Sequence, residues 1–147
     1  MIHPDVNVLV YAHREDAVDH TRYRQWLEEI LQSGEPYGIS DHVLSGFLRV
    51  VTHPRVFTPP SPIGSALDFV GQIREQPNCR LVAPGPRHWQ IFTGLCHSLS
   101  AAGNLVPDVW FAALAIESDC EWITTDRAYE RFPGLRWRHP LSGKASG

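Results

Sequence analysis

The sequence lacks most of the features that would place it at once in a familiar class of protein. Its three cysteines are too few and too widely spaced for a disulfide framework or a CxxC zinc site, so we expect them to be small buried residues. It has no stretch near the roughly 20 apolar residues of a membrane span. It also has no basic segment followed by an apolar run at its start. These absences predict a protein of the reducing cytoplasm that does not contact a membrane.

Several enzyme motifs and an excess of positive charge are also missing. The sequence contains no GxGxxG, no P-loop, no GxSxG and no HExxH, which argues against dehydrogenases, P-loop enzymes and serine hydrolases. Its 13 Lys and Arg residues are balanced by 16 Asp and Glu residues, for a formal net charge of −3. This balance excludes a polycation that holds nucleic acid by bulk charge. Any contact with RNA or DNA must therefore come from a local patch.

The composition is that of one folded domain. The chain has 147 residues, of which 43% are hydrophobic and 20% charged, enough apolar material to bury a core and too few charges for a disordered chain. We place the domain over residues 1–141 and expect residues 142–147 to form a flexible tail.

Hydrophobic patterning predicts alternating strands and helices. The run Val6–Ala12 is continuous and rich in β-branched residues, which favours a buried strand bordered by Asp5. Apolar residues at helical spacing predict amphipathic helices over about residues 20–33, 41–53, 63–73 and 89–99, and a buried helix over 109–117. Further short strands are predicted over residues 37–39, 79–82 and 121–125. This order favours a three-layer α/β fold with a central, mainly parallel sheet flanked by helices.

Acidic residues lie at the junctions between these elements: Asp5, Asp41, Asp108 and Asp126. Ligands of parallel sheets gather at the carboxyl ends of the strands, where several of these acids could meet. Clustered carboxylates repel one another unless a hard cation neutralises them, so Mg²⁺ or Mn²⁺ is the expected cofactor, and phosphodiester hydrolysis is the expected chemistry. Each acid also has a structural explanation, as a helix N-cap for Asp41 and Asp108 or as a turn residue for Asp126.

Five segments together resemble a known family. They are Asp5-Val-Asn-Val-Leu-Val-Tyr-Ala, Phe47-Leu-Arg-Val, Gly103-Asn-Leu-Val-Pro-Asp, Thr124-Thr-Asp-Arg and Arg131-Phe-Pro-Gly-Leu-Arg-Trp-Arg. From Asp5 to about Pro140 the chain resembles a PIN domain, most closely the VapC-type toxins of mycobacterial type. The resemblance implies a PIN-like three-layer fold and a Mg²⁺- or Mn²⁺-dependent endoribonuclease. It also implies a homodimer that is inhibited by a VapB antitoxin, whose C-terminal segment covers the active site.

The resemblance assigns three of the family's four acids. Asp5 matches the first acid, Asp108 the third and Asp126 the fourth, so these are the expected catalytic and metal-binding residues. The second acid, usually a Glu just before Phe-Leu-Arg, is Gly46 in this chain. A glycine within a helix costs about 1 kcal/mol relative to alanine, which calls for a cause such as close packing or room for a ligand. We consider Asp41 as a substitute metal ligand.

Two polar residues beside the acids are candidates for supporting roles. The amide of Asn7 could hold Asp5 in place or bind a water in the site, although an ordinary structural hydrogen bond explains it as well. The hydroxyl of Thr125 could approach the metal or the phosphate, but a β-branched residue at the end of a strand needs no functional reason.

Arginines provide the expected contacts to RNA. Arg49 could bind a phosphate or a carboxylate, or could simply be an exposed helix residue. The segment 127–144 adds a basic edge that could guide RNA, with an aromatic ring to stack on a base; its basic residues are Arg127, Arg131, Arg136, Arg138 and Lys144, and its ring is Trp137. A solvated surface strand with Trp137 in the core is the equal alternative.

Two other functions remain open at this point. Gly46 could mark a PIN-like fold that has lost strong metal binding and acts as an RNA- or protein-binding module. A carboxylate-site phosphatase that acts on small phosphate esters is the third possibility. Retained binding without cleavage would favour the module, and turnover of a generic phosphomonoester without RNA cleavage would favour the phosphatase.

Overall fold

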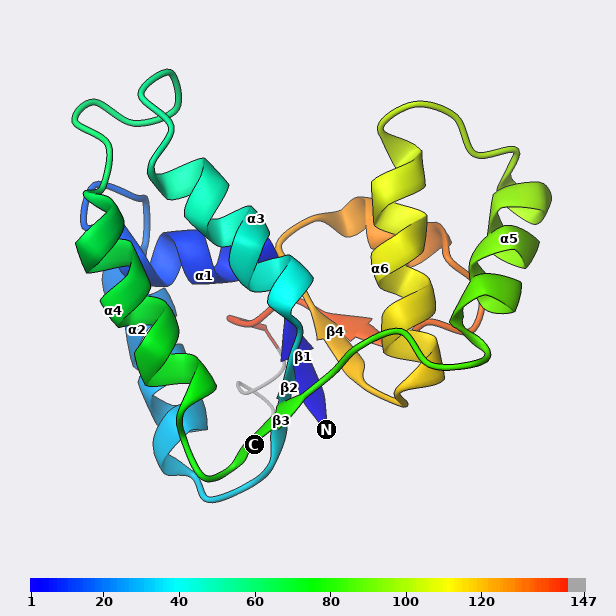
Figure 1. Cartoon of the computed structure of the whole chain (residues 1–147), viewed down its shortest axis with the longest axis horizontal. Coiled ribbons are helices and arrows are strands. Elements are labelled where there is room, and N and C mark those ends of the chain that lie inside the picture. The colour runs from blue at the N-terminus through cyan, green and yellow to red at the C-terminus, as the bar shows by residue number, and fades with distance from the viewer. Residues whose placement is uncertain (143–147) are drawn as a thin grey trace.

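Five short parallel strands form the centre of the molecule. The computed structural model describes residues 1–142, and in it the strands lie in the order β3-β2-β1-β4-β5 (Figure 1). All the strand pairs are parallel. The strands are β1 Ile2–Pro4, β2 Tyr37–Ile39, β3 Cys79–Leu81, β4 Glu121–Ile123 and β5 Trp137–Arg138.

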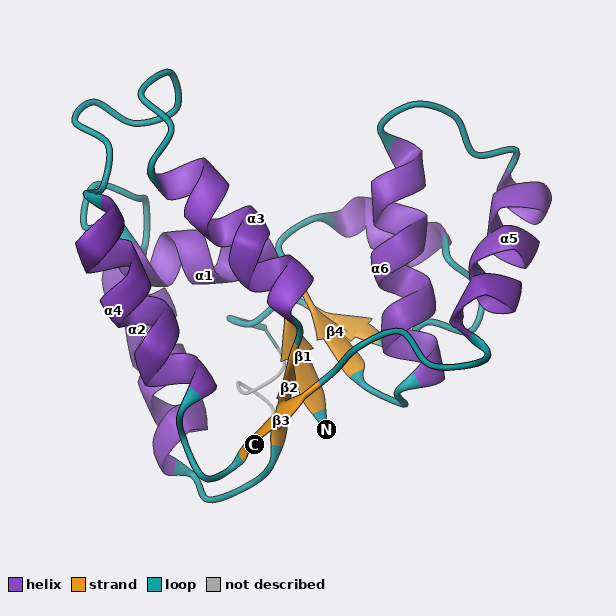
Figure 2. Cartoon of the chain, in the orientation of Figure 1, coloured by secondary structure: helices purple, strands orange, loops and turns teal. Residues whose placement is uncertain are grey.

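Helices cover both faces of this sheet. Figure 2 shows one group of helices on the left of the strands and a pair on the right. The first group is α1 Val6–His13, α2 His20–Gln32, α3 Asp41–Val51 and α4 Ile63–Arg74; the pair is α5 His88–Leu99 and α6 Leu105–Glu117. A short 3-10 helix, η1 Arg127–Arg131, follows β4. The predicted three-layer α/β fold with a parallel sheet is confirmed.

The prediction of a strand over Val6–Ala12 is wrong, because this run is helix α1. The strand is the preceding segment Ile2–Pro4, and Asp5 caps the helix by accepting a hydrogen bond from the backbone N–H of Val6. Helix α1 packs between α2 and α3; half of its residues are buried and the other half are partly buried, so none is exposed. A helix buried on nearly all sides has no polar face, so its hydrophobic pattern cannot be told from that of a buried strand.

The other predicted elements are confirmed with small shifts. The N-cap of α3 is Ser40 and not Asp41, since the Ser40 hydroxyl accepts from the N–H of Val43 at 3.2 Å. Helix α6 begins at Leu105, earlier than predicted, so Asp108 lies in its first turn and is not its N-cap. Strands β3 and β4 end one and two residues earlier than expected.

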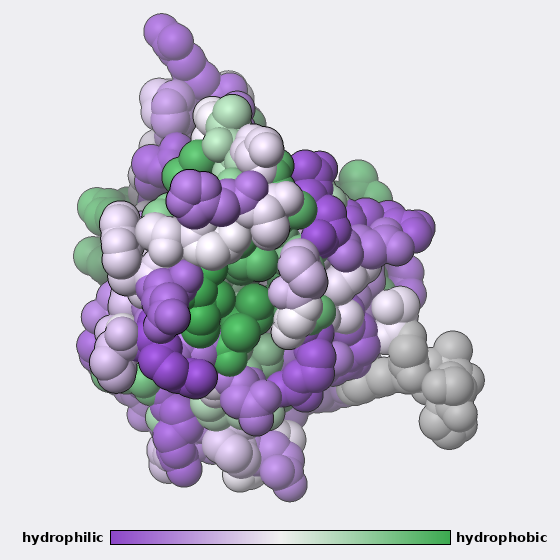
Figure 3. All heavy atoms as spheres, turned by 90° about the vertical axis from the view of Figure 1, so that its right-hand side faces the viewer, coloured by the Kyte–Doolittle hydropathy of each residue, from purple (hydrophilic) through white to green (hydrophobic). Residues whose placement is uncertain are grey.

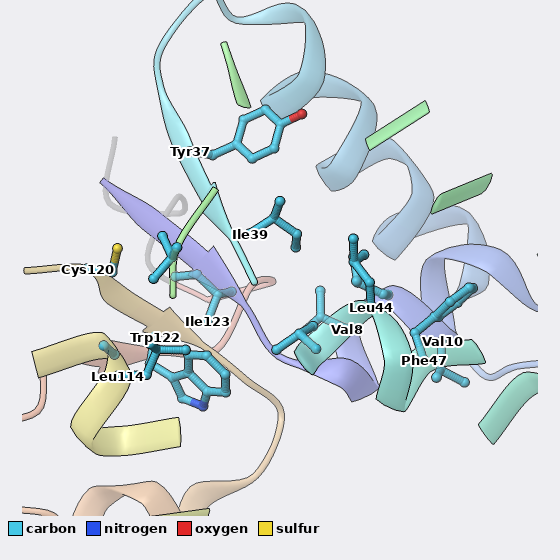
Figure 4. Close-up of a cluster of buried hydrophobic side chains, with 14 of the residues drawn as sticks. Val8, Val10, Tyr37, Ile39, Leu44, Phe47, Leu114, Cys120, Trp122 and Ile123 are labelled. Carbon is cyan, nitrogen blue, oxygen red and sulfur yellow. The ribbon is translucent and has the colours of Figure 1, made fainter. Parts of the chain in front are cut away.

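The hydrophobic core lies on both sides of the sheet. Figure 4 shows Leu44 and Phe47 among the side chains that fill the space between the sheet, α1 and α3, while Leu114 and Trp122 lie on the α6 side. His3 of β1 is fully buried beside Trp122, with ring centroids 5.1 Å apart. Burial lowers the pKa of His3 to about 4, so its neutral ring donates from Nδ1 to the Pro4 carbonyl.

Gly46 allows α3 to lie close against the start of α1. A Cβ atom at this position would be 3.0 Å from Cγ2 of Val6, closer than side chains normally pack. Of the two explanations for this glycine, the structure therefore supports close packing.

Two further predictions concern membrane contact and the limits of the domain. Within the described part of the chain, no helix is long and apolar enough to cross a membrane. Residues 143–147, most of the predicted tail, lie outside the described residues, and so does Lys144. The domain limits of 1–141 stay a prediction.

We predict opposite effects of alanine at two helical glycines. A Cβ at Gly94 of α5 meets no atom within 4 Å, so Gly94→Ala should raise the free energy of unfolding by about 0.5–1 kcal/mol. Gly46→Ala should lower it by about 1 kcal/mol, because the contact with Val6 outweighs the gain in helix propensity. Urea unfolding of both variants measures the difference. Equal gains in the two variants would show that Val6 does not constrain this position.

Candidate active site

The pairing of β1 with β4 positions the centre of the site. Pro4 lies beside Ile123 in register, and the N–H of Asp5 donates to the Ile123 carbonyl at 2.8 Å. The next residues along the two strands, Asp5 and Thr124, therefore emerge together at the carboxyl end of the sheet. In Figure 1 this is the point where β1 leads into α1, between α3 and α6.

Asp5 is held by a dense set of hydrogen bonds. One carboxylate oxygen accepts from the N–H of Val6 at 2.7 Å, and the other accepts from the Thr124 hydroxyl at 2.7 Å. The amide of Asn7 is a weaker third donor, 3.5 Å from the same oxygen and 3.4 Å from Thr124 Oγ1. Asp5 is only 7% exposed, so these contacts fix its orientation before any ligand arrives.

Asp126 and Asp108 enter the site from two other elements. Asp126 follows β4, where its N–H donates to Thr124 Oγ1 at 3.0 Å and its carboxylate accepts from the N–H of Ala128 at 2.9 Å. Asp108, in the first turn of α6, accepts from the hydroxyl of Tyr129 in η1 at 3.3 Å. The three acids thus come from three segments of the chain that the sheet brings together.

Burial and mutual repulsion act on these carboxyl groups. Burial raises the pKa of Asp5 to about 6; the charges of Asp108 and Asp126 add to the rise, and hydrogen bonds from Thr124 and Val6 oppose it. Burial also raises the pKa of Asp108, against the hydrogen bond from its tyrosine partner. The negative charge of the cluster is therefore costly in the free protein, and a cation would relieve that cost.

The three acids line one open pocket of about 410 Å³. Its remaining lining residues divide into a polar part beside the acids and an apolar wall. They are Val6, Asn7, Val10, Tyr11, Arg49, Val50, Val56, Phe57, Phe111 and Tyr129. Arg49 is exposed and makes no hydrogen bond or ion pair within residues 1–142, so its guanidinium is available to an anionic ligand.

The donor set fits a hard divalent cation in its chemistry. Carboxylate oxygens are the ligands that Mg²⁺ and Mn²⁺ prefer, and Mg²⁺ usually keeps several waters and takes few protein ligands. In the described part of the chain, no three His, Cys, Asp or Glu side chains lie close enough to enclose an ion by themselves. The pocket thus offers carboxylates for a partly hydrated ion and not a closed protein cage.

The structure does not bring Asp41 to this group, so the idea that it replaces the missing acid is not supported. Asp41 lies in the first turn of α3, 73% exposed at its side chain, and forms an ion pair with Arg74 of α4 at 3.0 Å. It is not among the pocket-lining residues. The end of β2 points toward the site, but the first turn of α3 directs this carboxylate toward α4.

The supporting hydroxyl belongs to Thr124, not to Thr125. Thr124 is fully buried and links two acids, whereas Thr125 contributes its N–H to Asn7 Oδ1 at 3.4 Å. The predicted strand ended two residues too late, at Thr125, so Thr124 was overlooked. No sequence motif marks Tyr129, and only its contact with Asp108 reveals it.

Asn7 lies beside Asp5, as predicted, but on a helix and not on a strand. Strand alternation would have placed it on the same side as Asp5, but it lies in the first turn of α1 instead. Its amide nevertheless contacts both Asp5 and Thr124.

Of the predicted RNA-binding arginines, the structure places only Arg49 in the pocket. Arg136 pairs with Asp119 at 2.9 Å, and Arg138 pairs with Glu121 at 3.2 Å. The remaining members of the basic edge, Arg127 and Arg131, are exposed, and Trp137 is half-buried in the edge strand β5. A guiding role for this edge stays a prediction.

We predict that the burial of Asp5 makes stability pH-dependent. A carboxyl whose pKa is higher in the folded than in the unfolded chain loses stability as pH rises from about 4 through 6. In chelator, the free energy of unfolding should therefore fall by up to about 3 kcal/mol relative to Asp5→Asn between pH 4 and 7. Asp41→Asn, which removes an exposed carboxylate, should follow the wild type. A constant difference between wild type and Asp5→Asn would contradict this account.

We also predict that the Thr124 hydroxyl supports the folded site. Thr124→Val removes the hydroxyl that donates to Asp5 and accepts from the N–H of Asp126, which should cost about 1–3 kcal/mol. Thr124→Ser keeps the hydroxyl and should cost less. Denaturant unfolding of the two variants at pH 7 separates the hydrogen bonds from the packing of the methyl group. A Thr124→Val variant as stable as the wild type, beside a destabilised Thr124→Ser, would mean that packing alone matters.

Comparison with known proteins shows the family to which the chain belongs. The profile of the family described as "PIN domain" matches residues 2–135. The chain is 45% identical over 144 residues to "Ribonuclease VapC43" of Mycobacterium tuberculosis, covering 98% of each. Its fold resembles the Rickettsia felis VapBC2 structure bound to promoter DNA (TM-score 0.67, 20% identity, 95% and 98% of the chains). It also resembles the structure of M. tuberculosis VapC20, a sarcin-ricin loop cleaving toxin, with a TM-score of 0.59 and 14% sequence identity. This match covers 92% of the present chain and 99% of the VapC20 chain. The chain belongs to the PIN domain family, within its VapC-type branch.

Proposed function

We propose that the chain is the endoribonuclease toxin of a toxin-antitoxin module and that it hydrolyses phosphodiester bonds of RNA with Mg²⁺ or Mn²⁺. The observation that carries this proposal is the convergence of Asp5, Asp108 and Asp126 on one open pocket that also contains a free arginine. Carboxylates for a cation beside a guanidinium for a phosphate form a site suited to a phosphodiester. The closely similar curated relatives carry the name ribonuclease, which supports RNA as the substrate.

The chain's own residues would orient the substrate and the cofactor. Asp5, Asp108 and Asp126 would hold the cation, which when bound supplies an activated water and stabilises the leaving oxygen. Thr124 keeps Asp5 and the segment of Asp126 in register, and Tyr129 steadies Asp108. Burial raises the pKa of Tyr129, so its phenol stays protonated and remains a donor.

Arg49 would bind the phosphate from a different element of the fold than the acids. It lies on α3, whereas Asp108 and Asp126 approach from α6 and from the segment after β4. A guanidinium can bind two phosphate oxygens at once and does not lose its charge at any working pH. It would therefore fix the scissile group against the carboxylates without competing for the cation.

A VapB-type antitoxin and a second copy of the chain are the proposed protein partners. Solved structures with this fold include VapBC assemblies from Rickettsia felis and Haemophilus influenzae, which support an antitoxin partner. Self-association has support from the surface over α5 and α6, where apolar atoms gather in the middle of a hydrophilic ring (Figure 3). Trp89 of α5 is 69% exposed on this helix.

One observation favours the alternative of a binding module with weakened catalysis. The second acid of the family is absent at Gly46, and the described carboxylates do not enclose an ion by themselves. Such a module would bind RNA through the same pocket but would not cut it. Nothing specific favours the phosphatase.

We predict metal-dependent cleavage of RNA. The purified chain should cut a labelled mixed RNA pool with Mn²⁺ or Mg²⁺ but not with chelator, and Asp108→Asn should lower the rate at least about 100-fold. Asp41→Asn should cut like the wild type, because its carboxylate lies outside the pocket. Expression of the wild type should slow growth, and expression of Asp108→Asn should not. Binding without cleavage by a folded, metal-loaded chain would favour the module instead.

A further inference from the structure

The pocket extends well beyond the carboxylates. Its far wall is lined by Tyr11 of α1, Val50 of α3, and Val56 and Phe57 of the loop that follows α3. A partly hydrated ion and one phosphate need only the polar part of a pocket of about 410 Å³. The apolar wall is therefore surface that bond cleavage alone does not explain.

Building on the proposed function, we propose that this wall is a subsite for one unpaired base of the RNA, adjacent to the cleaved phosphodiester. Phe57 is its stacking surface, and Val50 and Val56 are its apolar sides. Arg49 lines the same pocket as the wall and the acids, and its guanidinium binds the phosphate of the nucleotide whose base is bound. The subsite determines which phosphodiester enters the catalytic part.

Phe57 is fixed in place before any substrate arrives. The Arg14 guanidinium lies over its ring, 4.2 Å from the centroid. Arg14 is itself anchored, because it donates to both carboxylate oxygens of Asp16, at 2.9 and 2.7 Å, and to Ser61 Oγ at 3.2 Å. One side of the ring is thus occupied by a held cation, and the ring also lines the pocket.

The loop that carries Phe57 is also ordered by its backbone. The N–H groups of Val56 and Phe57 both donate to the His53 carbonyl, at 3.0 and 3.1 Å. Further along, the N–H of Ser61 donates to the Val51 carbonyl at 2.8 Å. A ligand that binds such a loop loses little affinity to ordering it.

The exposure and charge of the wall favour a base over a polypeptide side chain. Val56 is 55% exposed and Phe57 half-buried, so apolar surface faces water at the mouth of the pocket. Every nucleobase has an apolar face that stacks on an aromatic ring. The nearby Arg49 attracts the phosphate that every base carries with it, whereas it repels a basic peptide. Continuity with the carboxylates places such a base beside the reacting bond.

The test uses short RNAs that span a cut site mapped from the pool. Each carries the fluorescent base 2-aminopurine or an abasic site next to the cut, and binding is measured with Ca²⁺ in place of Mg²⁺ to slow cleavage. The test variants are Phe57→Leu and Val56→Asn, and thermal melting checks their folding. The matched controls are Phe92→Leu, which removes a half-buried ring outside the pocket, and Val18→Asn, at a valine that is 84% exposed.

We expect Phe57→Leu to weaken RNA binding about tenfold, to abolish 2-aminopurine quenching and to broaden the set of cut sites, with the controls unchanged. The abasic RNA should bind wild type and Phe57→Leu equally. Unchanged affinity, quenching and cut sites in Phe57→Leu, while the wild type still cleaves, would overturn the base subsite and leave the ribonuclease intact. If Phe57→Leu does not fold, Val56→Asn decides by the same readouts. A wild type that neither binds nor cuts RNA overturns both proposals.

Discussion

The parallel pairing of β1 with β4 is the contact on which the site depends. These strands have three residues each, yet their register aligns segments more than a hundred residues apart in the chain. The hydrogen bond from the Asp5 N–H to Ile123 extends the pairing to the point where β1 becomes α1. A shift of one residue would point the side chains of one strand to the other face and would separate Asp5 from Thr124.

Packing on both sides stabilises this short pair. Trp122, fully buried in β4, lies beside His3 of β1 and stacks on Phe111 of α6, with the Trp122 and Phe111 ring centroids 5.3 Å apart. On the opposite side of the sheet, the absence of a side chain at Gly46 lets α3 approach Val6 at the start of α1. The β1–β4 pair is thereby held between two layers of helices. The acids at the carboxyl ends of these strands are positioned by this packing.

The same arrangement makes the site costly to fold. Three carboxylates share one pocket, and the most buried of them, Asp5, has a raised pKa because burial and its neighbours both disfavour its charge. Thr124 and the N–H of Val6 offset part of that cost with short hydrogen bonds. An uncompensated electrostatic cost of this kind is typical of functional sites, where folding stability is reduced in favour of ligand binding.

The sequence by itself determined the architecture and the acids. The spacing of apolar residues was sufficient to predict the amphipathic helices. In α2, for example, the buried Tyr23, Trp26 and Leu27 repeat at helical intervals. The alternation of elements predicted the parallel sheet. Motif resemblance singled out Asp5, Asp108 and Asp126, which the structure brings to one pocket and whose catalytic role stays a prediction.

Only the tertiary structure decided what each residue contacts. The run after Asp5 became a helix because it is buried between α2 and α3, and local pattern carries no information on neighbours of that kind. The choice of Thr124 over Thr125 depended on a strand that ends two residues earlier than predicted. The exclusion of Asp41 depended on its ion pair with Arg74, outside the pocket. The apolar wall around Phe57 combines Tyr11 of α1 with Val50 and Val56, which lie near Phe57 in the chain. Spacing along a sequence reports local geometry, whereas a site is made by side chains that only the folded chain brings together.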